Sequence, residues 1–316
     1  MSQNDIERAI LSDLYDVSSF NAEGINFEEM CMKWGWDSIS FRNIVQRMTD
    51  DGLIRPQGGG RLKLTSHGIL RAEREGLAPE ESVERNNQAR ELILETLAKV
   101  YEEKGAYHLT FIDHIPRYTG LDERTSTDSI ILLINLGFVE RSGNAGVKIL
   151  YRGLDYVKDY RERKALVDEF ARISELMPQP RGRALQRLIA KIVEQHGWSQ
   201  EEGVRASHEE MDVIVYKERE YYLLESKWEK DPVEAGVVRE LYGKLGNRAD
   251  VRGIITSMSG FTGGAEQQVK DYVGDKVIVL FGPDDIRSMV NGKATFEELL
   301  NAKYKALVTR RQVLFD

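Results

Sequence analysis

The stretch from residue 209 to residue 228 reads EEMDVIVYKEREYYLLESKW and decides the fold of the carboxy-terminal part of the chain. Its two apolar runs, MDVIVY and YYLLESK, are predicted strands, and the polar segment KERE between them makes the pair a hairpin. Alternate residues of a strand share a face, so Glu225 and Lys227 are expected on the same side. Asp212 belongs to the partner strand, and we expect it to converge with them at one end of the hairpin.

A cluster of two carboxylates and one ammonium group is costly unless the groups pair or bind a metal. One interpretation is a structural ion pair at a hairpin end, because short patterns of this kind occur often by chance. The other interpretation is a hydrolytic site in which the carboxylates hold a divalent cation. The sequence around the hairpin decides between the two.

Strands alternate with helices on both sides of this hairpin. An amphipathic helix is predicted before it, with Leu185, Leu188 and Ile192 on one face. After it, the sequence predicts helices at 232–246, 263–273, 284–290 and 294–307, and buried strands at 251–256 and 276–281. The order α-β-β-α-β-α-β predicts a mixed central sheet flanked by helices.

Four segments in this order carry a resemblance to a known family. They are RGRALQRLIAKIVEQHGW (181–198), EEMDVIV, YYLLESKW and RGIITSMSGFTGGA (252–265). Together they resemble the restriction-endonuclease-like nucleases with a PD-(D/E)xK site, in particular the Mrr-like branch, over residues 181–290. The resemblance implies an α/β nuclease domain over residues 181–316.

The resemblance also implies roles for individual residues. Asp212 and Glu225 match the two carboxylates that hold a divalent metal, together with the backbone carbonyl of Ser226. Oxygen ligands of this kind suit Mg²⁺ or Mn²⁺. Lys227 matches the catalytic lysine that orients or activates water. The chain departs from the family at Gln186, where a glutamate is usual. A neutral amide is a weak metal ligand, so Gln186 is only an accessory candidate. Glu210 is a second accessory candidate, although its side chain should face away from those of its neighbours.

The amino-terminal part has a different pattern. Helices are predicted at 4–16, 26–33 and 37–50, with Asp37 or Ser38 as the N-cap of the third. They are followed by DGLIRPQGGGRLKLTSHG, in which a GGG turn joins two short strands. Three helices followed by a hairpin predict a winged-helix domain, and this run resembles the wing of such domains. We assign the domain to residues 1–80.

A second copy of this pattern follows. The segment LGFVERSGNAGVKILYRGLDYV (136–157) corresponds to DGLIRPQGGGRLKLTSHGILRA (51–72), which predicts a second winged helix at residues 86–165. A helical linker is then expected at 166–180, ending at Pro178-Gln179-Pro180, because prolines cannot continue a helix. The fold class is therefore two α+β winged-helix domains followed by an α/β nuclease domain.

Candidate DNA contacts follow from these assignments. Arg42 and Arg47 lie on the predicted recognition helix, and Arg61 and Lys63 lie on the predicted wing. In the nuclease domain, Ser259 and Gln268 are placed to contact a phosphate. Several aspartates border the recognition helix and weaken this interpretation. Protein–protein contact by the two modules is the alternative.

Charge sets a limit on nonspecific DNA binding. The net charge is −8, and residues 1–85 carry 10 basic and 15 acidic side chains, whereas residues 86–165 carry 12 of each. No segment is basic overall, so contact with DNA must depend on local patches and on bound cations that offset the carboxylates.

Cys31 is the single cysteine, which excludes an internal disulfide and a cysteine-based zinc site. The first residues, MSQNDIERAI, lack the apolar core of a signal peptide. The apolar run Ser129–Val139 is far shorter than the roughly 20 residues that cross a bilayer. We therefore expect a cytoplasmic protein with no membrane association.

The sequence predicts a divalent-metal-dependent DNA endonuclease in defence against foreign or modified DNA. Because one such site cuts one strand, we expect a homodimer or higher homo-oligomer, with residues 130–133 and 308–315 as candidate surfaces. One alternative is a winged-helix DNA-binding or regulatory protein with an inactive nuclease fold, which Gln186 would favour. Another is a nuclease activated by a partner protein or signal bound by the amino-terminal modules.

Overall fold

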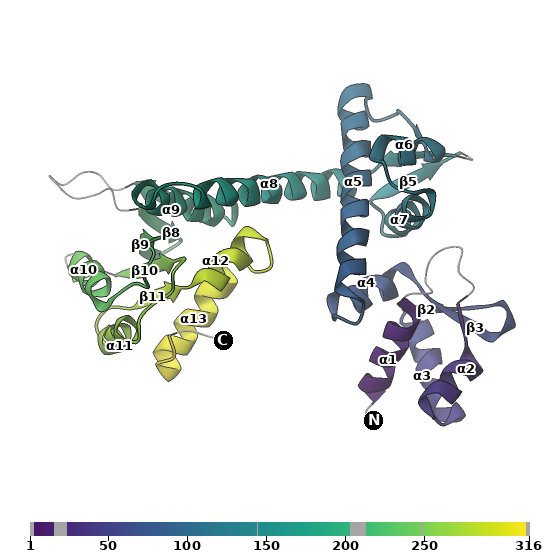
Figure 1. The fold of residues 1–316 in the computed structure, drawn as a ribbon, viewed down its shortest axis with the longest axis horizontal. Helices are drawn as coiled ribbons and strands as arrows, with labels where there is room; N and C mark the ends of the chain where they lie inside the picture. Colours follow the sequence, from purple (N-terminus) through teal and green to yellow (C-terminus); the bar gives the residue numbers. More distant parts are fainter. Residues whose placement is uncertain are drawn as a thin grey trace. The chain divides into compact units, whose positions relative to one another are not determined.

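The computed structural model describes residues 3–15, 24–143, 145–202, 213–246, 248 and 250–313 (Figure 1). The chain divides into two compact units, Met1–Tyr160 and Arg161–Asp316. The division falls within helix α8 (Tyr151–Ser174). Among the described residues, no helix is both long enough and apolar enough to cross a membrane.

The first module of unit 1 consists of three helices, a small sheet and a fourth helix. The helices lie within one residue of their predicted positions: α1 (Gln3–Tyr15), α2 (Phe27–Trp34) and α3 (Ser38–Asp50). The predicted N-cap of α3 is confirmed, because the Asp37 carboxylate accepts a hydrogen bond from the Ser40 N–H. Strands β1 (Ile25–Asn26), β2 (Ile54–Gln57) and β3 (Arg61–Leu64) form an antiparallel sheet in the order β1-β3-β2, and α4 (Ser66–Arg74) follows.

The second module repeats this sheet order with its own elements. Helix α5 (Glu80–Lys104) begins six residues before the predicted domain boundary at 86, and α6 (Ile115–Thr119) follows it. Helix α7 (Glu123–Asn135) precedes the predicted hairpin. The sheet has the order β4-β6-β5, formed by β4 (Thr110–Phe111), β5 (Val139–Ser142) and β6 (Gly146–Ile149). The sequence repeat therefore corresponds to a repeated strand pairing.

Each module has a separate apolar core. The core of the first module includes Leu11, Phe41 and Met48, and that of the second includes Leu97 and Val147. The apolar run 130–133, a predicted surface for a second chain, is mostly buried within unit 1: Ile130, Leu132 and Leu133 are at most 5% exposed. That prediction is wrong for these three side chains, because other parts of unit 1 cover them.

Unit 2 contains the predicted mixed sheet. Its strand order is β11-β10-β9-β8-β7, with β9 parallel to β10, β10 parallel to β11, and the other pairs antiparallel. The strands are β7 (Ser199–Glu202), which was not predicted, β8 (Val213–Lys217), β9 (Glu220–Lys227), β10 (Val251–Ser257) and β11 (Ile278–Phe281). The helices are α9 (Pro178–Gln195), α10 (Ala235–Gly246), α11 (Gly263–Tyr272), α12 (Pro283–Val290) and α13 (Phe296–Arg310).

Helices cover both faces of this sheet (Figure 1). Tyr222 and Leu224 of β9 belong to a core that includes side chains of α9 and α12. Leu223, which points to the opposite face, belongs to a core with side chains of α10 and α11. The sheet therefore separates two cores, and successive residues of β9 alternate between them.

The predicted linker at 166–180 differs from the structure in two ways. Leu166 and Ile173 of α8 are buried in the core of unit 2, so this segment is part of that unit's packing. Helix α9 begins at Pro178 and not after Pro180. A proline is accommodated in the first turn of a helix because the N–H it lacks has no partner within the helix there.

Candidate active site

The charged residues of the β9 motif meet on the α10 face of the sheet. Lys227 Nζ lies 3.0 Å from Glu225 Oε1, so the two side chains share a face as predicted. Lys244 of α10 approaches from the other side, with its Nζ 3.2 Å from Glu225 Oε2. The Glu225 side chain is 18% exposed. The Glu225 carboxylate thus lies between two ammonium groups, one from its own strand and one from α10.

Helix α9 holds the backbone of β9 next to this cluster. The Gln186 amide nitrogen donates to the Leu224 carbonyl at 3.1 Å. The Arg181 guanidinium donates to the Trp228 carbonyl at 3.2 and 3.3 Å and lies over the Trp228 ring. Three residues separate these two contacts along the strand. Both ends of the segment that carries Glu225 and Lys227 are therefore anchored to one helix.

The hydrogen bond of Gln186 gives a structural role to the glutamine that replaces the family's usual glutamate. A glutamate cannot donate a hydrogen bond to the Leu224 carbonyl when it is ionised, whereas the Gln186 amide does. The residue predicted as an accessory metal ligand thus supports the backbone of β9. Position 182 also faces this strand, since a Cβ there would lie in ordinary van der Waals contact with the Ser226 carbonyl oxygen, at 3.5 Å.

Two predicted site residues, Asp212 and Glu210, lie outside the described residues. Asp212 directly precedes Val213, the first described residue of β8. The Cα of Val213 pairs with that of Leu224, the residue before Glu225. Among the described residues, no group of three or more His, Cys, Asp or Glu side chains is placed to hold a metal.

The hydroxyl groups at the end of β10 are used inside the fold. Thr256 donates to the Ser226 hydroxyl at 2.7 Å, and Ser257 donates to the Gly260 carbonyl at 2.9 Å. Ser259 donates to the Glu229 carbonyl. Gln268, another predicted phosphate contact, accepts a hydrogen bond from Arg239 at 3.3 Å. A phosphate contact through the Ser259 hydroxyl proton therefore requires this internal bond to break.

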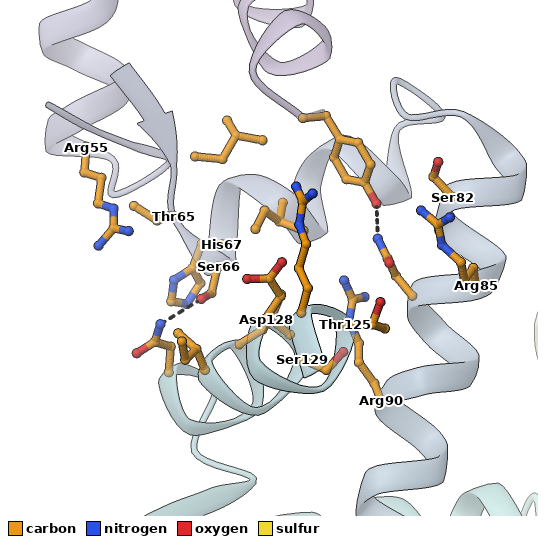
Figure 2. Close-up of a pocket in the computed structure, with 18 of the residues that line it drawn as sticks. Arg55, Thr65, Ser66, His67, Ser82, Arg85, Arg90, Thr125, Asp128 and Ser129 are labelled. Carbon is orange, nitrogen blue, oxygen red and sulfur yellow. Dashed lines mark hydrogen bonds between the residues drawn. The ribbon is translucent and has the colours of Figure 1, made fainter. Parts of the chain in front are cut away.

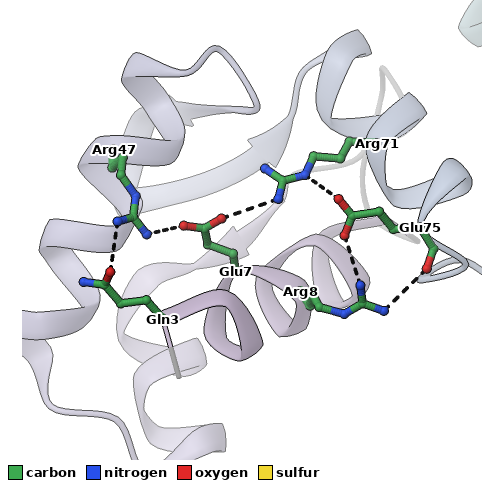
Figure 3. A network of polar contacts seen from close by, with 6 residues as sticks. All are labelled: Gln3, Glu7, Arg8, Arg47, Arg71 and Glu75. Atoms are coloured by element: carbon green, nitrogen blue, oxygen red, sulfur yellow. Dashed lines mark hydrogen bonds and ion pairs between the residues drawn. The ribbon is translucent and has the colours of Figure 1, made fainter. Parts of the chain in front are cut away.

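In unit 1, the predicted DNA contact Arg47 belongs to an internal network of charges (Figure 3). Its guanidinium pairs with Glu7 of α1 and donates to Gln3 at 3.2 Å. Glu7 also contacts Arg71 of α4 at 3.5 Å, and Arg71 pairs with Glu75 at 2.7 Å. The network joins α1, α3 and α4, so Arg47 has a structural role in this conformation.

The expectation that Lys63 is presented on the wing is wrong. Its side chain is fully buried, and burial together with the nearby Arg55 charge lowers the pKa of the ammonium. A buried side chain cannot reach a DNA phosphate without a rearrangement. Arg42 is exposed, with its guanidinium 5.7 Å from the centre of the Phe27 ring, and Arg61 on β3 is half-buried. Arg42, Arg47 and Arg61 are the predicted contacts of this module that keep access to solvent, although Arg47 is paired with Glu7.

Lys244 and Arg181 are the functional candidates that sequence reasoning missed. Lys244 lies 17 positions after Lys227 on a helix whose neighbouring residues give no sign of a site. Arg181 opens the family-like segment, but nothing local indicates that it contacts the Trp228 carbonyl. Both contacts arise from the packing of helices against β9.

The comparisons with known proteins concern the same region. Residues 179–290 match the Mrr_cat family, described as restriction endonuclease, and the match includes Gln186, Glu225, Lys227 and Lys244. No curated protein matches the chain.

Several solved structures are similar at low identity. Restriction endonuclease FokI bound to DNA is 13% identical with a TM-score of 0.32, covering 96% of this chain and 69% of that chain. Another structure of restriction endonuclease FokI is 14% identical with a TM-score of 0.29, covering 96% and 70%. The mRNA-binding domain of elongation factor SelB from E. coli in complex with SECIS RNA is 14% identical with a TM-score of 0.22, covering 46% and 98%. Similarities of this size do not determine a fold, whereas the family match shows that residues 179–290 form a restriction-endonuclease-like domain with a mixed sheet flanked by helices.

Proposed function

We propose that the protein is a divalent-metal-dependent DNA endonuclease that hydrolyses phosphodiester bonds, with its site at the end of β9. The observation that carries this proposal is the cluster of Glu225, Lys227 and Lys244 within the restriction-endonuclease match. A carboxylate beside two ammonium groups suits both a cation and a phosphate. Defence against foreign or modified DNA is the biological role that we propose with it.

The donor set near β9 fits a hard divalent cation. We propose that Asp212, Glu225 and the Ser226 carbonyl hold Mg²⁺ or Mn²⁺, since carboxylate and carbonyl oxygens are the ligands these ions prefer. Such an ion supplies Lewis-acid polarisation of the phosphate and a lower pKa of water. In the described structure both Glu225 oxygens contact lysines, so the cation would compete with these ammonium groups for the carboxylate.

The lysines have separate proposed tasks. Lys227, next to the carboxylate, orients the attacking water and stabilises the negative charge that develops on the phosphate. Lys244 adds a second positive charge from α10 and draws the DNA backbone to the site. Gln186 and Arg181 keep the β9 backbone fixed, so that these side chains do not have to be ordered when the substrate binds.

We propose that the two modules of unit 1 are winged helices, supported by three helices before an antiparallel hairpin in the first module and by the repeated strand order in the second. Their contribution to DNA binding should be small. Arg47 is engaged with Glu7 and Lys63 is buried, so two of the four proposed basic contacts are used inside the fold. This favours recognition of a partner or signal by these modules over reading of a DNA sequence.

Cleavage of both strands by a site that hydrolyses one bond requires two sites, so we propose a homodimer as the working form. Of the proposed dimer surface at residues 308–315, Val308 is exposed and could contact a second chain, whereas Val313 is buried within its own chain. Phe315 lies outside the described residues. Light scattering gives the mass of the particle. A strict monomer near 36 kDa that linearises plasmid with first-order dependence on protein would exclude the dimer.

The test of the endonuclease is cleavage of supercoiled plasmid by the full chain. With Mg²⁺ or Mn²⁺ we expect nicked and then linear DNA, and with EDTA we expect intact DNA. Cleavage that persists in EDTA would contradict the metal requirement. No cleavage of plasmid or of methylated plasmid with either ion would leave the proposal without support.

A further inference from the structure

Unit 1 contains a cavity of about 610 Å³, which we call the inter-module cavity (Figure 2). Its walls come from the loop between β3 and α4, from the amino-terminal half of α5, and from α7. The first module therefore supplies one side and the second module the other. The volume falls in the range of about 300–1,000 Å³ that is typical of small-molecule sites.

The charges around the cavity contrast with those of the surrounding sequence. Residues 1–165 carry 22 basic and 27 acidic side chains. Among the described residues that line the cavity, four are arginines (Arg55, Arg85, Arg90 and Arg124), and Asp128 is the one acidic residue. Guanidinium groups are therefore concentrated at the cavity although the region is acidic overall, and this favours an anionic ligand.

The arginines of the cavity differ in whether their guanidinium groups already pair with a carboxylate. Arg90 forms a bidentate pair with Glu73, with distances of 2.7 and 2.8 Å, and is used by the fold. Arg55 and Arg85 are exposed, and the side chain of neither makes a hydrogen bond or ion pair with a described residue. Two guanidinium groups are therefore available to a ligand. Guanidinium groups bind phosphate oxygens in bidentate geometry.

The backbone adds to this preference. The cavity is lined by Thr65, Ser66 and His67, which form the N-cap and first residues of α4 (Figure 2). Thr125, in the first turn of α7, lines the other wall, but its N–H already donates to the N-cap Asp122 at 2.9 Å, so the backbone contribution comes from α4. First-turn N–H groups have no acceptor within the helix, and the positive end of the helix dipole favours negative charge.

The walls are held in place by hydrogen bonds across the unit. The Asn135 amide of α7 donates to the Ser66 hydroxyl at 3.0 Å and so links the two modules. The Asn86 amide of α5 donates to the Tyr15 hydroxyl at 3.0 Å (Figure 2). A pocket with fixed walls binds without a large ordering cost.

We propose that the inter-module cavity binds a phosphate-bearing small molecule of nucleotide size. Arg55 and Arg85 contact the phosphate groups, while hydroxyl and amide groups and the apolar side chains Leu64, Ile69 and Ile131 surround the remainder of the ligand. A DNA duplex spreads its phosphates along an extended surface, with about one charge per 1.7 Å, and fits a concave space of this size poorly. The site lies in unit 1, so this proposal does not rest on the proposed nuclease.

The test is calorimetric titration of the full chain in EDTA, with ATP, inorganic pyrophosphate and adenosine as probes. We expect ATP and pyrophosphate to bind and to raise the melting temperature, and adenosine to do neither, because binding to the folded state stabilises it. Arg55→Gln and Arg85→Gln should each weaken binding about tenfold or more, as expected for a lost charged hydrogen bond. Arg74→Gln is the matched control, since Arg74 is exposed on α4 and does not line the cavity; its affinity should stay within about twofold.

Two further experiments test whether ATP binds at the proposed nuclease site instead of the cavity, and whether DNA competes for the cavity. The double variant Lys227→Met, Lys244→Met should bind ATP as the natural chain does; a loss of binding would place the phosphate at β9 and overturn the proposal. An equimolar 20-base-pair duplex should not displace ATP, and displacement would assign the arginines to DNA. Absence of binding by both ATP and pyrophosphate, or equal weakening in Arg74→Gln, would also overturn it.

Discussion

A carboxylate between two cations occurs in both units, with different consequences. In unit 1, Glu7 lies between Arg47 and Arg71, and the three residues come from three different helices. In unit 2, Glu225 lies between Lys227 and Lys244, on a strand whose backbone is anchored by α9 on both sides of the motif. We call these the Glu7 cluster and the Glu225 cluster.

The difference lies in the elements that each cluster joins. The arginines of the Glu7 cluster have further partners, Gln3 and Glu75, so the charges link helix to helix (Figure 3). The Glu225 cluster stands where β9 ends, one residue beyond the pairing of Leu224 with Val213, and Asp212 precedes Val213 in sequence. One carboxylate between two cations therefore joins three helices in unit 1, whereas in unit 2 it lies at the end of β9, where we propose the active site.

The largest expected effect separates the clusters by activity. Glu225→Gln and Lys227→Met should each lower plasmid cleavage by roughly 10³-fold or more, because Glu225 is a proposed ligand of the cation and Lys227 the proposed stabiliser of charge on the phosphate. Lys244→Met should lower it by roughly tenfold, through weaker attraction of the backbone. Initial rates of plasmid nicking measure both. Lys305→Met, at an exposed position of α13, is the control and should cleave normally.

Melting temperatures of the same variants complete this prediction. Removing one charge from the Glu225 cluster should change the melting temperature by no more than about 2 °C, since partly exposed ion pairs contribute little to stability. A variant that melts many degrees lower and still cuts DNA would show that the Glu225 cluster is a structural ion pair.

The second effect is the reverse case in unit 1. Glu7→Gln removes the charge that joins Arg47 to Arg71, and it should lower stability by roughly 1 kcal/mol, because these pairs are only partly buried. For a unit of this size the melting temperature should fall by about 2–4 °C. Cleavage should be unchanged once the protein is folded. Equal stability together with lost cleavage would remove the distinction between the clusters.

A smaller effect distinguishes two arginines of the same helix. Arg42 of α3 is exposed, whereas Arg47 is paired with Glu7. Each phosphate contact that is lost should flatten the slope of log K against log[salt] by about 0.9. Fluorescence anisotropy of the full chain on duplex DNA should therefore show this change for Arg42→Gln and no change for Arg47→Gln. If Arg47→Gln gives the larger change, its pair with Glu7 opens on DNA.

The smallest effect concerns pH and unit 2. Burial lowers the pKa of His196 below its usual value of 6.5, against the opposing effect of Glu298 and Glu297, and its Nδ1 accepts from the Phe296 N–H at 3.5 Å. The unfolded chain then takes up the proton more readily than the folded one. Stability from neutral His196 is present above pH 6.5 and declines as the pH falls below it.

Melting curves of the full chain between about pH 8 and pH 5.5 measure this decline. His196→Gln should make the transition of unit 2 less dependent on pH. His108→Gln, at an exposed position in unit 1, is the control and should leave that dependence unchanged. A steeper decline in His196→Gln would mean that the charged form is favoured by the fold.

Much of the local structure followed from the order of residues. The alternation in YYLLESK predicted β9 and the shared face of Glu225 and Lys227, and both are present because neighbouring side chains of a strand must point to opposite sides. The helices of unit 2 and the mixed sheet followed from periodicity and from the family-like segments. The start of α9 was predicted too late, because prolines that end one helix are also tolerated in the first turn of the next.

The partners of the charged side chains were decided by tertiary structure. Arg47 was assigned to DNA from its place on a helix, yet its carboxylate partner is 40 positions away on α1. Lys63 looked exposed on a predicted wing and is buried. Lys244 meets Glu225 only because α10 packs on that face of the sheet, and the arginines of the inter-module cavity come together only through the packing of the two modules. Periodicity fixes which side of an element a residue occupies, whereas ion pairs and cavities depend on contacts between elements that lie far apart in the chain.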